Sequence, residues 1–380
     1  MKKLVENKSF SVLIPDGESI FALKVLRCLG KIKGIHVIIL SNDAQAMVRF
    51  SRYCDKFITY IEKNEPDRLA AITNTLVKIK ADVILPVDIP TIRLISANQK
   101  EIEKITRIIP LPVIENIDIT DDKWLTYEWM NENKIATPST VLFQPGNDFE
   151  EKLFHLTFPV LIKPRKGSGG EGIEIFQDKE SLLSFCEKNT KSIDLIVQSF
   201  IKGFDIDCSI LCKDGDILAF TIQKRFVYTD QPVSGELAVD FLFHESTYQT
   251  VKELAKKFCW SGIAHIDLRY DENDQQIKVI EINPRFWASV TYSILAGINF
   301  PYLACLFALN SELPKVEFYS KRLIQLRSAI KIILNKMITR NRKDLYFDNI
   351  FLDQVSFKDP LPYFISKYPR IFRKIFGTVS

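Results

Sequence analysis

The chain has 380 residues, of which 46% are hydrophobic and 26% are charged, and no internal repeat or low-complexity segment is visible. This composition excludes a fibre, a solenoid and a largely disordered chain, and the length favours two or three globular domains. The net charge of +4 is uneven, because residues 321–380 carry 13 Lys+Arg and 4 Asp+Glu, which leaves −5 for the first 320 residues.

Residues 1–118 alternate predicted strands and helices, which is typical of a parallel sheet. FSVLIPDG, HVIILS and ADVILPVD are predicted strands, and residues 19–29 have apolar side chains at helical spacing. No GxGxxG motif follows the first strand, so the sequence does not support a dinucleotide site. Asp16 and Asp88 end two strands, where open α/β sheets bind ligands, but turn and helix-cap roles explain them equally well.

Residues 119–325 mix helices with strands. Thr120-Asp121-Asp122 supplies a cap residue and acids for a helix that runs to about residue 133. Further helices are predicted over 149–158, 179–189 and 246–260, and strands over 159–176 (interrupted by a loop), 195–212 (interrupted at Gly203) and 217–227.

A glycine-rich loop joins two of these strands. Residues 166–172 read KGSGGEG, with four glycines in seven positions, and glycine lets the backbone approach a ligand closely. The loop cannot be a Walker A loop, because that loop leads into a helix. A strand–loop–strand flap can cover phosphates with its amides, and Lys163 and Arg165 beside it would suit a polyphosphate. The alternative is a long hairpin turn.

The stretch VIEINPRFW contains a polar row on an otherwise apolar strand. Glu281, Asn283 and Arg285 occupy alternate positions, so their side chains share one face of the strand. A carboxylate, an amide and a guanidinium in one row suit neither a core nor an ordinary surface, so the row requires a partner.

The preceding stretch IAHIDLRY is the predicted partner strand. If Asp267 lies opposite Glu281, an unbroken register ends in a three-residue loop over 273–275, a normal hairpin length. His265 then lies opposite Asn283. In this register Asp267, Glu281 and Asn283 share one face, while Ile280 belongs to the opposite, apolar face.

Two adjacent carboxylates repel each other by roughly 4 kcal/mol at an effective dielectric constant of about 20. Protonation, a basic partner such as Arg285 or Arg269, or a metal ion would relieve that repulsion. Oxygen ligands from Asp, Glu and Asn are those that Mg²⁺ prefers, and the upstream flap favours the metal. His265 is interpreted as a packing residue beside the ligands.

Residues 286–311 contain no charged residue, and a stretch of this length is long enough to cross a membrane. The polar residues in this stretch and a Gly-Ile-Asn-Phe-Pro break favour two short buried helices instead. The seven cysteines have no CxxC spacing, and the apolar run after MKKLVENKSF is too short for a signal peptide. A reduced, cytoplasmic location is therefore expected.

Four stretches together resemble the ATP-grasp superfamily, and in particular proteins similar to the carbamoyl phosphate synthase large subunit and carboxylate–amine ligases. They are TDDKWLTYEWM, FPVLIKPRKGSGGEGI, VQSFIKGFDID and IDLRY followed by VIEINPRFW. The resemblance implies α/β and α+β architecture: a Rossmann-like pre-ATP-grasp domain over 1–118, then a two-subdomain ATP-grasp fold. The small subdomain with the flap would span 119–197, the large subdomain 198–325, and a basic extension 326–380.

The resemblance also assigns residues to an ATP site with Mg²⁺ or Mn²⁺. Asp267, Glu281 and Asn283 would be the metal ligands, and Arg285 would face the transferred phosphoryl group. Arg225 is a further candidate for contacting the substrate, with a solvated edge position as the alternative. The nucleotide would contact Lys123, Lys163, Gly167, Ser168, Gly169, Gly170, Gln198, Ser199, Phe200, Ile201 and Asp205.

The implied activity is a ligase that activates a small carboxylate as an acyl phosphate and joins it to an amine, releasing ADP and phosphate. A phosphotransferase acting on a hydroxyl and a non-catalytic ATP-binding or scaffold protein are the alternatives. The resemblance further suggests a homodimer, and no nucleic acid is expected. The basic, aromatic C-terminal segment either contacts an anionic membrane surface weakly or packs on the body of the protein.

Overall fold

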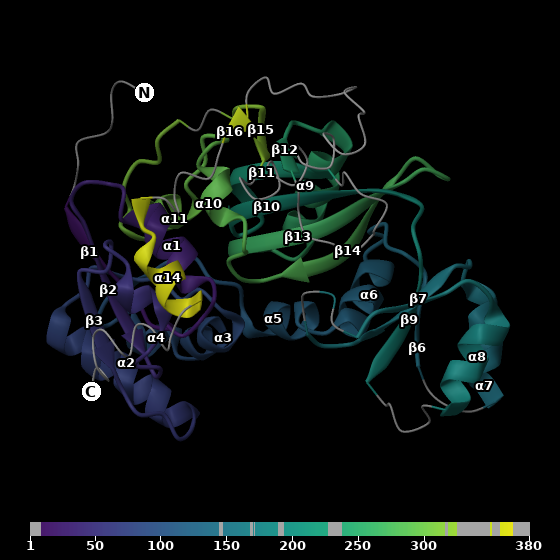
Figure 1. Cartoon of the computed structure of the whole chain (residues 1–380), viewed down its shortest axis with the longest axis horizontal. Coiled ribbons are helices and arrows are strands. Elements are labelled where there is room, and N and C mark those ends of the chain that lie inside the picture. Colours follow the sequence, from purple (N-terminus) through teal and green to yellow (C-terminus); the bar gives the residue numbers. More distant parts are fainter. Residues whose placement is uncertain are drawn as a thin grey trace.

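The computed structural model of the chain (Figure 1) describes residues 9–143, 147–167, 170, 172–188, 194–226, 238–315, 318–324, 350–351 and 358–367. Its strands form three sheets of five, seven and four strands. The five-stranded sheet lies at one end of the long axis and the four-stranded sheet at the other, with the seven-stranded sheet between them.

The first domain is built on the five-stranded sheet, whose pairings are all parallel and whose order is β3-β2-β1-β4-β5. The predicted Rossmann-like domain is therefore confirmed. Its strands are β1 (Phe10–Ile14), β2 (Ile35–Ser41), β3 (Lys56–Thr59), β4 (Val83–Ile84) and β5 (Arg107–Ile108). Its helices are α1 (Ala22–Leu29), the 3₁₀ helix η1 (Met47–Phe50), α2 (Glu65–Ile79), α3 (Ile89–Ala97) and α4 (Gln99–Ile102).

Two helices lead from this domain to the four-stranded sheet, here called the small sheet. They are α5 (Ile114–Thr120) and α6 (Lys123–Glu132). The small sheet is antiparallel in the order β6-β9-β7-β8, with β6 (Thr140–Leu142), β7 (Val160–Pro164), β8 (Glu174–Phe176) and β9 (Leu195–Ser199). α7 (Asn147–Lys152), η2 (Leu153–His155) and α8 (Lys179–Lys188) complete it, so the helix predicted over 149–158 is shorter than expected.

The seven-stranded sheet, here called the large sheet, has the order β14-β13-β10-β11-β12-β15-β16. Its strands are β10 (Gly203–Lys213), β11 (Asp216–Phe226), β12 (Ala238–Phe241), β13 (Gly262–Asp271), β14 (Ile277–Asn283), β15 (Lys321–Ile324) and β16 (Ile350–Phe351). Helix α9 (Glu245–Lys257) packs against it. All pairings are antiparallel except that of β15 with β16. Together the three sheets confirm the predicted fold class.

The predicted β13–β14 hairpin forms, but its register is broken. Asp267 pairs with Glu281 and His265 with Asn283, as expected. Beyond that pair the register shifts, and Leu268 lies opposite Val279 instead of Ile280. A β-bulge re-aims side chains locally, so Ile280 lines a cleft beside Glu281 instead of the apolar face.

The uncharged stretch 286–311 forms two short helices, α10 (Val290–Ser293) and α11 (Phe300–Ala308), as predicted. Their apolar residues share one core with β1, β2 and α1 of the first domain and with the large sheet. Within the described residues, no helix is both long and apolar enough to cross a membrane.

A segment near the C-terminus packs on the first domain. Helix α14 (Leu361–Lys367) lies against η1. Just before it, buried Asp359 accepts hydrogen bonds from the Arg27 guanidinium at 2.9 Å and the Ser51 hydroxyl at 2.7 Å. This part of the predicted basic extension therefore packs on the body of the protein.

Candidate functional site

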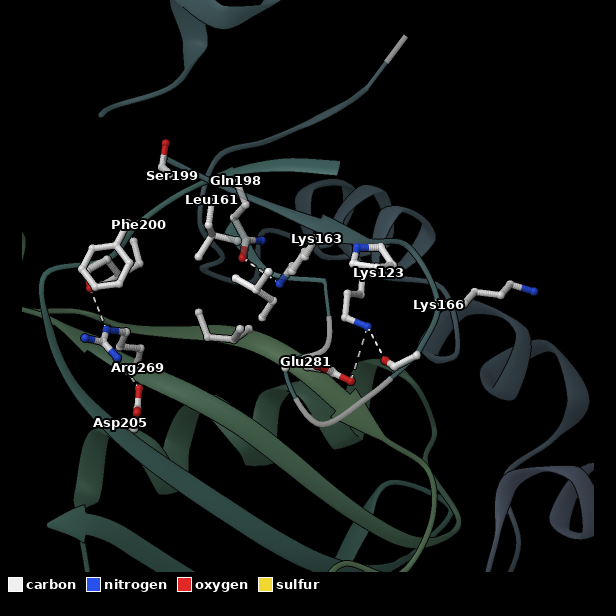
Figure 2. A pocket seen from close by; sticks show the side chains of 16 residues that line it. Lys123, Leu161, Lys163, Lys166, Gln198, Ser199, Phe200, Asp205, Arg269 and Glu281 are labelled. Carbon is white, nitrogen blue, oxygen red and sulfur yellow. Dashed lines mark hydrogen bonds and ion pairs between the residues drawn. The ribbon is translucent and has the colours of Figure 1, made fainter. Parts of the chain in front are cut away.

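A cleft of about 740 Å³ lies between the small sheet and the large sheet. Figure 2 shows the side chains that line it, which come from α6, the glycine-rich loop, both sheets and the segment between β9 and β10. Nine predicted nucleotide-binding residues line it: Lys123, Lys163, Gly167, Gly170, Gln198, Ser199, Phe200, Ile201 and Asp205. The structure therefore brings together residues that are up to 82 positions apart in the chain.

Lys163 lies buried on β7, where its ammonium donates a 2.9 Å hydrogen bond to Oε1 of Gln198 (Figure 2). Nε2 of Gln198 in turn donates to the Thr140 hydroxyl at 2.8 Å. Burial lowers the pKa of Lys163 to about 8, against the opposing effect of the Glu281 carboxylate. Among the described residues no carboxylate forms a salt bridge with Lys163, so its ammonium group suits a phosphate.

Lys123 begins α6 and connects the glycine-rich loop to the large sheet. Its ammonium donates a 2.7 Å hydrogen bond to the Gly167 carbonyl and lies 3.7 Å from the Glu281 carboxylate. Asp122 fixes its position, because that carboxylate caps α6 through the Trp124 and Leu125 amides. Asp122 also binds the Arg165 guanidinium at 2.5 Å.

Arg269 organises the segment between β9 and β10. It donates a 2.6 Å hydrogen bond to the Ile201 carbonyl and pairs with the Asp205 carboxylate. Its guanidinium lies 5.0 Å from the centre of the Phe200 ring (Figure 2). These contacts direct the Arg269 guanidinium to the Ile201–Asp205 segment, so it is not the basic partner of the Asp267–Glu281 pair. Sequence analysis missed this role.

The three residues predicted to bind a metal, here called the metal row, lie side by side on β13 and β14, and Glu281 among them lines the cleft. Asp267 and Glu281 lie opposite each other on β13 and β14. The Asn283 amide donates to the Asp267 carboxylate at 3.1 Å, and its oxygen accepts a 2.9 Å hydrogen bond from Arg285. Arg285 also donates to the Phe286 carbonyl at 3.0 Å and lies 4.5 Å from the Phe21 ring centre, in the first domain.

The donor atoms of this row fit a hard divalent cation. Burial raises the pKa of Glu281, and the neighbouring Asp267 charge adds to that rise, while Lys123 and Lys163 oppose it. A metal ion would remove the cost of keeping both carboxylates charged. Carboxylate and amide oxygens are the ligands that Mg²⁺ and Mn²⁺ accept.

The large sheet also gathers Asp207 and His265 beside Asp267, and the ligand atoms of these three residues lie within 4.8 Å of one another. Asp207 lies on β10 directly opposite Asp267. The Gln223 amide donates a 3.3 Å hydrogen bond to the Asp207 carboxylate. His265 packs against the Trp287 ring, as the packing interpretation expected. Sequence analysis missed Asp207, because only the β10–β13 pairing brings it near the row.

A second pocket of about 760 Å³ adjoins the cleft, and Lys123, Gly167 and Glu281 line both. Asp88 and Asp121 lie on its first-domain side, and Arg285 and Asn283 line it from the large-sheet side. Asp88 also caps α3, so the helix-cap role is confirmed, while contact with a ligand stays a prediction.

Asp16 has the turn role. It is buried and accepts hydrogen bonds from the Val87 and Asp88 amides at 2.9 Å. It does not line either pocket.

For three predicted site residues the structure describes no side-chain contacts. Ser168 and Gly169 lie outside the described residues. Arg225 lies on β11, opposite Val239, but its side chain is outside the described part. Their roles stay predictions.

Comparison with known families identifies the part of the chain that builds the cleft. Residues 120–289 match the family described as ATP-grasp domain. The chain contains an ATP-grasp domain. This domain is found in ATP-dependent enzymes that activate a carboxylate, most of them ligases.

The ATP-grasp domain and its surroundings have distant curated relatives. The chain is 24% identical over 263 residues to carbamoyl-phosphate synthase of Methanobrevibacter smithii, covering 66% of this chain and 68% of that protein. It is 25% identical over 322 residues to the carbamoyl phosphate synthase large chain of Clostridium beijerinckii, covering 80% of this chain. The match spans only 28% of that large chain.

Solved structures share the fold at low sequence identity. N5-carboxyaminoimidazole synthetase of Staphylococcus aureus, complexed with ADP, aligns over 90% of this chain and 88% of its own, with a TM-score of 0.63 and 15% identity. The L-amino acid ligase of Bacillus licheniformis aligns over 80% of this chain and 75% of its own, with a TM-score of 0.59 and 20% identity. A third structure is the biotin carboxylase domain of Hydrogenobacter thermophilus 2-oxoglutarate carboxylase, a dimer in complex with MgADP and bicarbonate. It aligns over 83% of this chain and 73% of its own, with a TM-score of 0.62 and 19% identity.

Proposed function

We propose that this protein is an ATP-dependent ligase that activates a small carboxylate as an acyl phosphate and joins it to an amine, with release of ADP and phosphate. One observation carries the proposal: the cleft between the two sheets and a second, charged pocket meet at Lys123, Gly167 and Glu281. Phosphoryl transfer requires such a junction, because donor and acceptor must meet in line.

The cleft would hold the nucleotide. The backbone of Ser199–Ile201 would meet the adenine, and Asp205 the ribose hydroxyls, with Arg269 keeping that segment in place. Lys163 and Lys123 would bind phosphate oxygens, and the glycine-rich loop would cover them and exclude water. The amide oxygen of Gln198 has two lone pairs, and Lys163 uses one of them. Gln198 would offer the other lone pair to the adenine.

Asp267, Glu281 and Asn283 would hold Mg²⁺, or Mn²⁺. When bound, the ion supplies charge neutralisation for the transferring phosphate. Asn283 orients Arg285 through the 2.9 Å hydrogen bond between its amide oxygen and the guanidinium. Arg285 therefore points into the second pocket, where it would hold the carboxylate during transfer and stabilise the developing charge.

The chemistry needs no covalent nucleophile from the protein. The substrate carboxylate oxygen attacks the γ-phosphorus, and the bond from that phosphorus to the ADP oxygen breaks. An amine then attacks the acyl carbon, phosphate leaves, and the amine loses a proton as the amide forms. The chain would supply positioning and charge, which are the main protein contributions to phosphoryl transfer.

The direct test measures Mg²⁺-dependent ATP turnover over pools of small carboxylates and amines, and scores ADP against AMP. Substrate-dependent ADP and phosphate, together with a new amide by mass spectrometry, would support the ligase. Glu281→Ala should lose this turnover, while Lys179→Ala, a change at a partly exposed position on α8 outside the cleft, should retain it. AMP as product would contradict the acyl-phosphate step, a phosphorylated product without an amide would indicate a phosphotransferase, and nucleotide binding without turnover would indicate a sensor.

The proposal also includes a cytoplasmic location, small-molecule partners and a homodimer. The biotin carboxylase domain named above was solved as a dimer, which supports the last of these. Size-exclusion chromatography with light scattering would test it, and a monomer at all concentrations would contradict it.

A further inference from the structure

A third pocket, of about 900 Å³, shares no lining residue with the two pockets described above. It is formed by η1 and by the segment that leads into α14. Its lining residues are Arg49, Phe50, Ser51, Arg52, Lys358, Asp359, Pro360 and Leu361. The proposed ligase activity gives this pocket no role.

The pocket carries a net positive charge. Arg49, Arg52 and Lys358 supply three cations, and Asp359 is the only acid among the described lining residues. Asp359 is buried, and the Arg27 guanidinium at 2.9 Å compensates its charge. The three cations of the pocket form no salt bridge within the described part of the chain. Like charges around one pocket repel each other, so an anionic ligand would bind here favourably.

Both arginines keep N–H donors for such a ligand. The Arg49 guanidinium donates to the Ala44 carbonyl at 2.9 Å and lies 5.5 Å from the centre of the Phe57 ring. The Arg52 guanidinium donates a long, 3.4 Å hydrogen bond to the Lys358 carbonyl. Each guanidinium has five N–H groups, and the described contacts use one of them. The planar arrangement of the others matches the oxygens of a phosphate group.

Apolar side chains lie exposed beside these cations. Leu361 lines the pocket and is 45% exposed, and Phe364, one turn further along α14, is 44% exposed. Tyr363 is exposed to the same extent as Leu361, whereas Pro362 and Ile365 are buried. α14 therefore packs on the protein with one side and presents apolar side chains to solvent with the other. Exposed apolar side chains that adjoin a basic pocket are typical of a membrane-contacting surface.

We propose that this face of the protein binds the surface of an anionic phospholipid membrane. Arg49, Arg52 and Lys358 bind the lipid phosphates, and Leu361 and Phe364 enter the layer between the headgroups and the acyl chains. A soluble phosphate compound or a nucleic acid would contact the cations alone and would leave the apolar side chains in water. The nucleotide cleft uses different residues, so membrane binding leaves nucleotide binding intact.

Sedimentation of the full chain with vesicles tests this proposal. The protein is mixed with vesicles of phosphatidylcholine, or of phosphatidylcholine with phosphatidylglycerol, and the bound fraction is measured against lipid concentration. The vesicles that contain phosphatidylglycerol should bind at least about tenfold more tightly, since each cation near an anionic surface contributes about fivefold. This preference should fall as the salt concentration rises, because salt screens the attraction. Equal binding to both kinds of vesicle, or no binding to either, would overturn the proposal.

Two charge variants locate the contact. Replacing Arg49, Arg52 and Lys358 together by Gln should weaken binding to the anionic vesicles by about a hundredfold. Arg52→Gln with Lys358→Gln changes only exposed residues and should weaken it by about twentyfold. Unchanged ADP affinity of both variants would show that they are folded. Wild-type vesicle binding by the folded variants would contradict the assignment.

A matched control removes the same charge elsewhere. It replaces three exposed lysines of α8 and α9 by Gln: Lys188, Lys252 and Lys256. Helix α8 lies at the other end of the long axis from α14 (Figure 1), and this control should bind vesicles as the wild type does. An equal loss in the control would assign the binding to net charge alone and would overturn the proposal.

The apolar part of the contact has its own variant. Leu361→Gln with Phe364→Gln should weaken binding to the anionic vesicles by about tenfold, because less apolar area is buried. Isothermal titration with glycerol phosphate, which carries the phosphate without the acyl chains, should show far weaker binding than the vesicles do. Wild-type vesicle binding by the apolar variant, or tight binding of glycerol phosphate, would indicate a site for a soluble phosphate compound instead.

The rest of the C-terminus requires a separate variant. Residues 368–380 lie outside the described residues and contain three basic residues and no acid. Replacing Arg370, Arg373 and Lys374 by Gln should leave most of the phosphatidylglycerol preference in place. A complete loss in this variant, with wild-type binding by the pocket variants, would assign the contact to the C-terminal residues and overturn the role of the pocket.

Discussion

Lys163 shows how a single buried position prepares a phosphate contact. Its ammonium lies on a neutral amide oxygen, that of Gln198, instead of a carboxylate. The buried charge is therefore only partly compensated, which lowers the pKa of Lys163 to about 8. A polyphosphate would supply the missing negative charge, and its binding would favour the protonated lysine.

This arrangement predicts the pH dependence of nucleotide binding. Below pH 8 Lys163 is charged in the free protein and ADP affinity should be constant. Above pH 8 the free lysine is neutral, so binding must take up a proton and affinity should fall as pH rises. Isothermal titration of MgADP against pH measures this.

Lys163→Gln is the variant that tests the assignment. It should weaken ADP binding by about tenfold to a hundredfold near neutral pH and remove the fall above pH 8, while Lys179→Gln should change neither. A wild-type pH profile in Lys163→Gln would assign the titration to another group.

Sequence alone placed Asp267 opposite Glu281 but not Lys163 beside Gln198. Alternation and hairpin length fix the first pair, because the two strands are consecutive. β7 and β9 are separated by β8 and α8, so their pairing depends on the assembled small sheet. The contact of Arg269 with Asp205 was missed for the same reason, since β10 and β13 are distant in the chain.

At the scale of elements, the start of α6 holds the glycine-rich loop. The Asp122 carboxylate caps the helix, accepting from the Trp124 amide at 2.9 Å, and pairs with Arg165 just before the loop. The Lys123 amide donates to the Arg165 carbonyl at 3.0 Å. Burial would raise the pKa of Asp122, but the hydrogen bonds from Arg165 and the two amides outweigh it and lower that pKa.

Asp122→Ala should therefore destabilise the protein. The loss of the cap alone costs about 0.5–2 kcal/mol, and the partly buried ion pair adds to it. The part of this free energy that comes from the lowered pKa is present above the unfolded pKa of an aspartate and is lost as pH falls through the folded value. Urea unfolding of Asp122→Ala beside Asp118→Ala measures the effect, and equal stability of the two variants would contradict this role.

The bulge in β14 is a feature of this strand that the sequence did not predict. The alternation of VIEIN predicted the strand and the face of Glu281 correctly, but not the extra residue opposite Leu268. Bulges occur next to active sites, where they re-aim side chains. Their position depends on what packs on either side of the strand, which a single sequence does not specify.

At the scale of the whole molecule, Asp359, near the C-terminal end of the described residues, packs on the first domain and stabilises that contact. Asp359 is buried and accepts from the Arg27 guanidinium, the Ser51 hydroxyl and the Arg52 amide. Removal of one partner from a buried ion pair costs about 3–5 kcal/mol. Asp359→Asn should lower the free energy of unfolding by an amount of that order.

Chemical denaturation of Asp359→Asn beside Glu101→Gln, an exposed acid on α4, checks this expectation. The nucleotide cleft lies between the other two sheets, so ADP affinity of folded Asp359→Asn should be unchanged. A stability loss no larger than that of Glu101→Gln, or a weakened ADP affinity, would contradict the docking role. The basic composition of residues 326–380 gave no signal for this contact, because it depends on a single acidic residue.

The metal row is central to the proposed ATP site, and one measurement tests it without knowledge of the substrates. The affinity for ADP is measured by isothermal titration with and without Mg²⁺, for the wild type and for Glu281→Gln, which keeps the shape of the side chain but removes its charge. Mg²⁺ should tighten ADP binding to the wild type by at least about tenfold, or about 1.4 kcal/mol, and should have little effect on Glu281→Gln. The same Mg²⁺ effect in both proteins, or no effect in the wild type, would contradict the assignment of Asp267, Glu281 and Asn283 as the metal site.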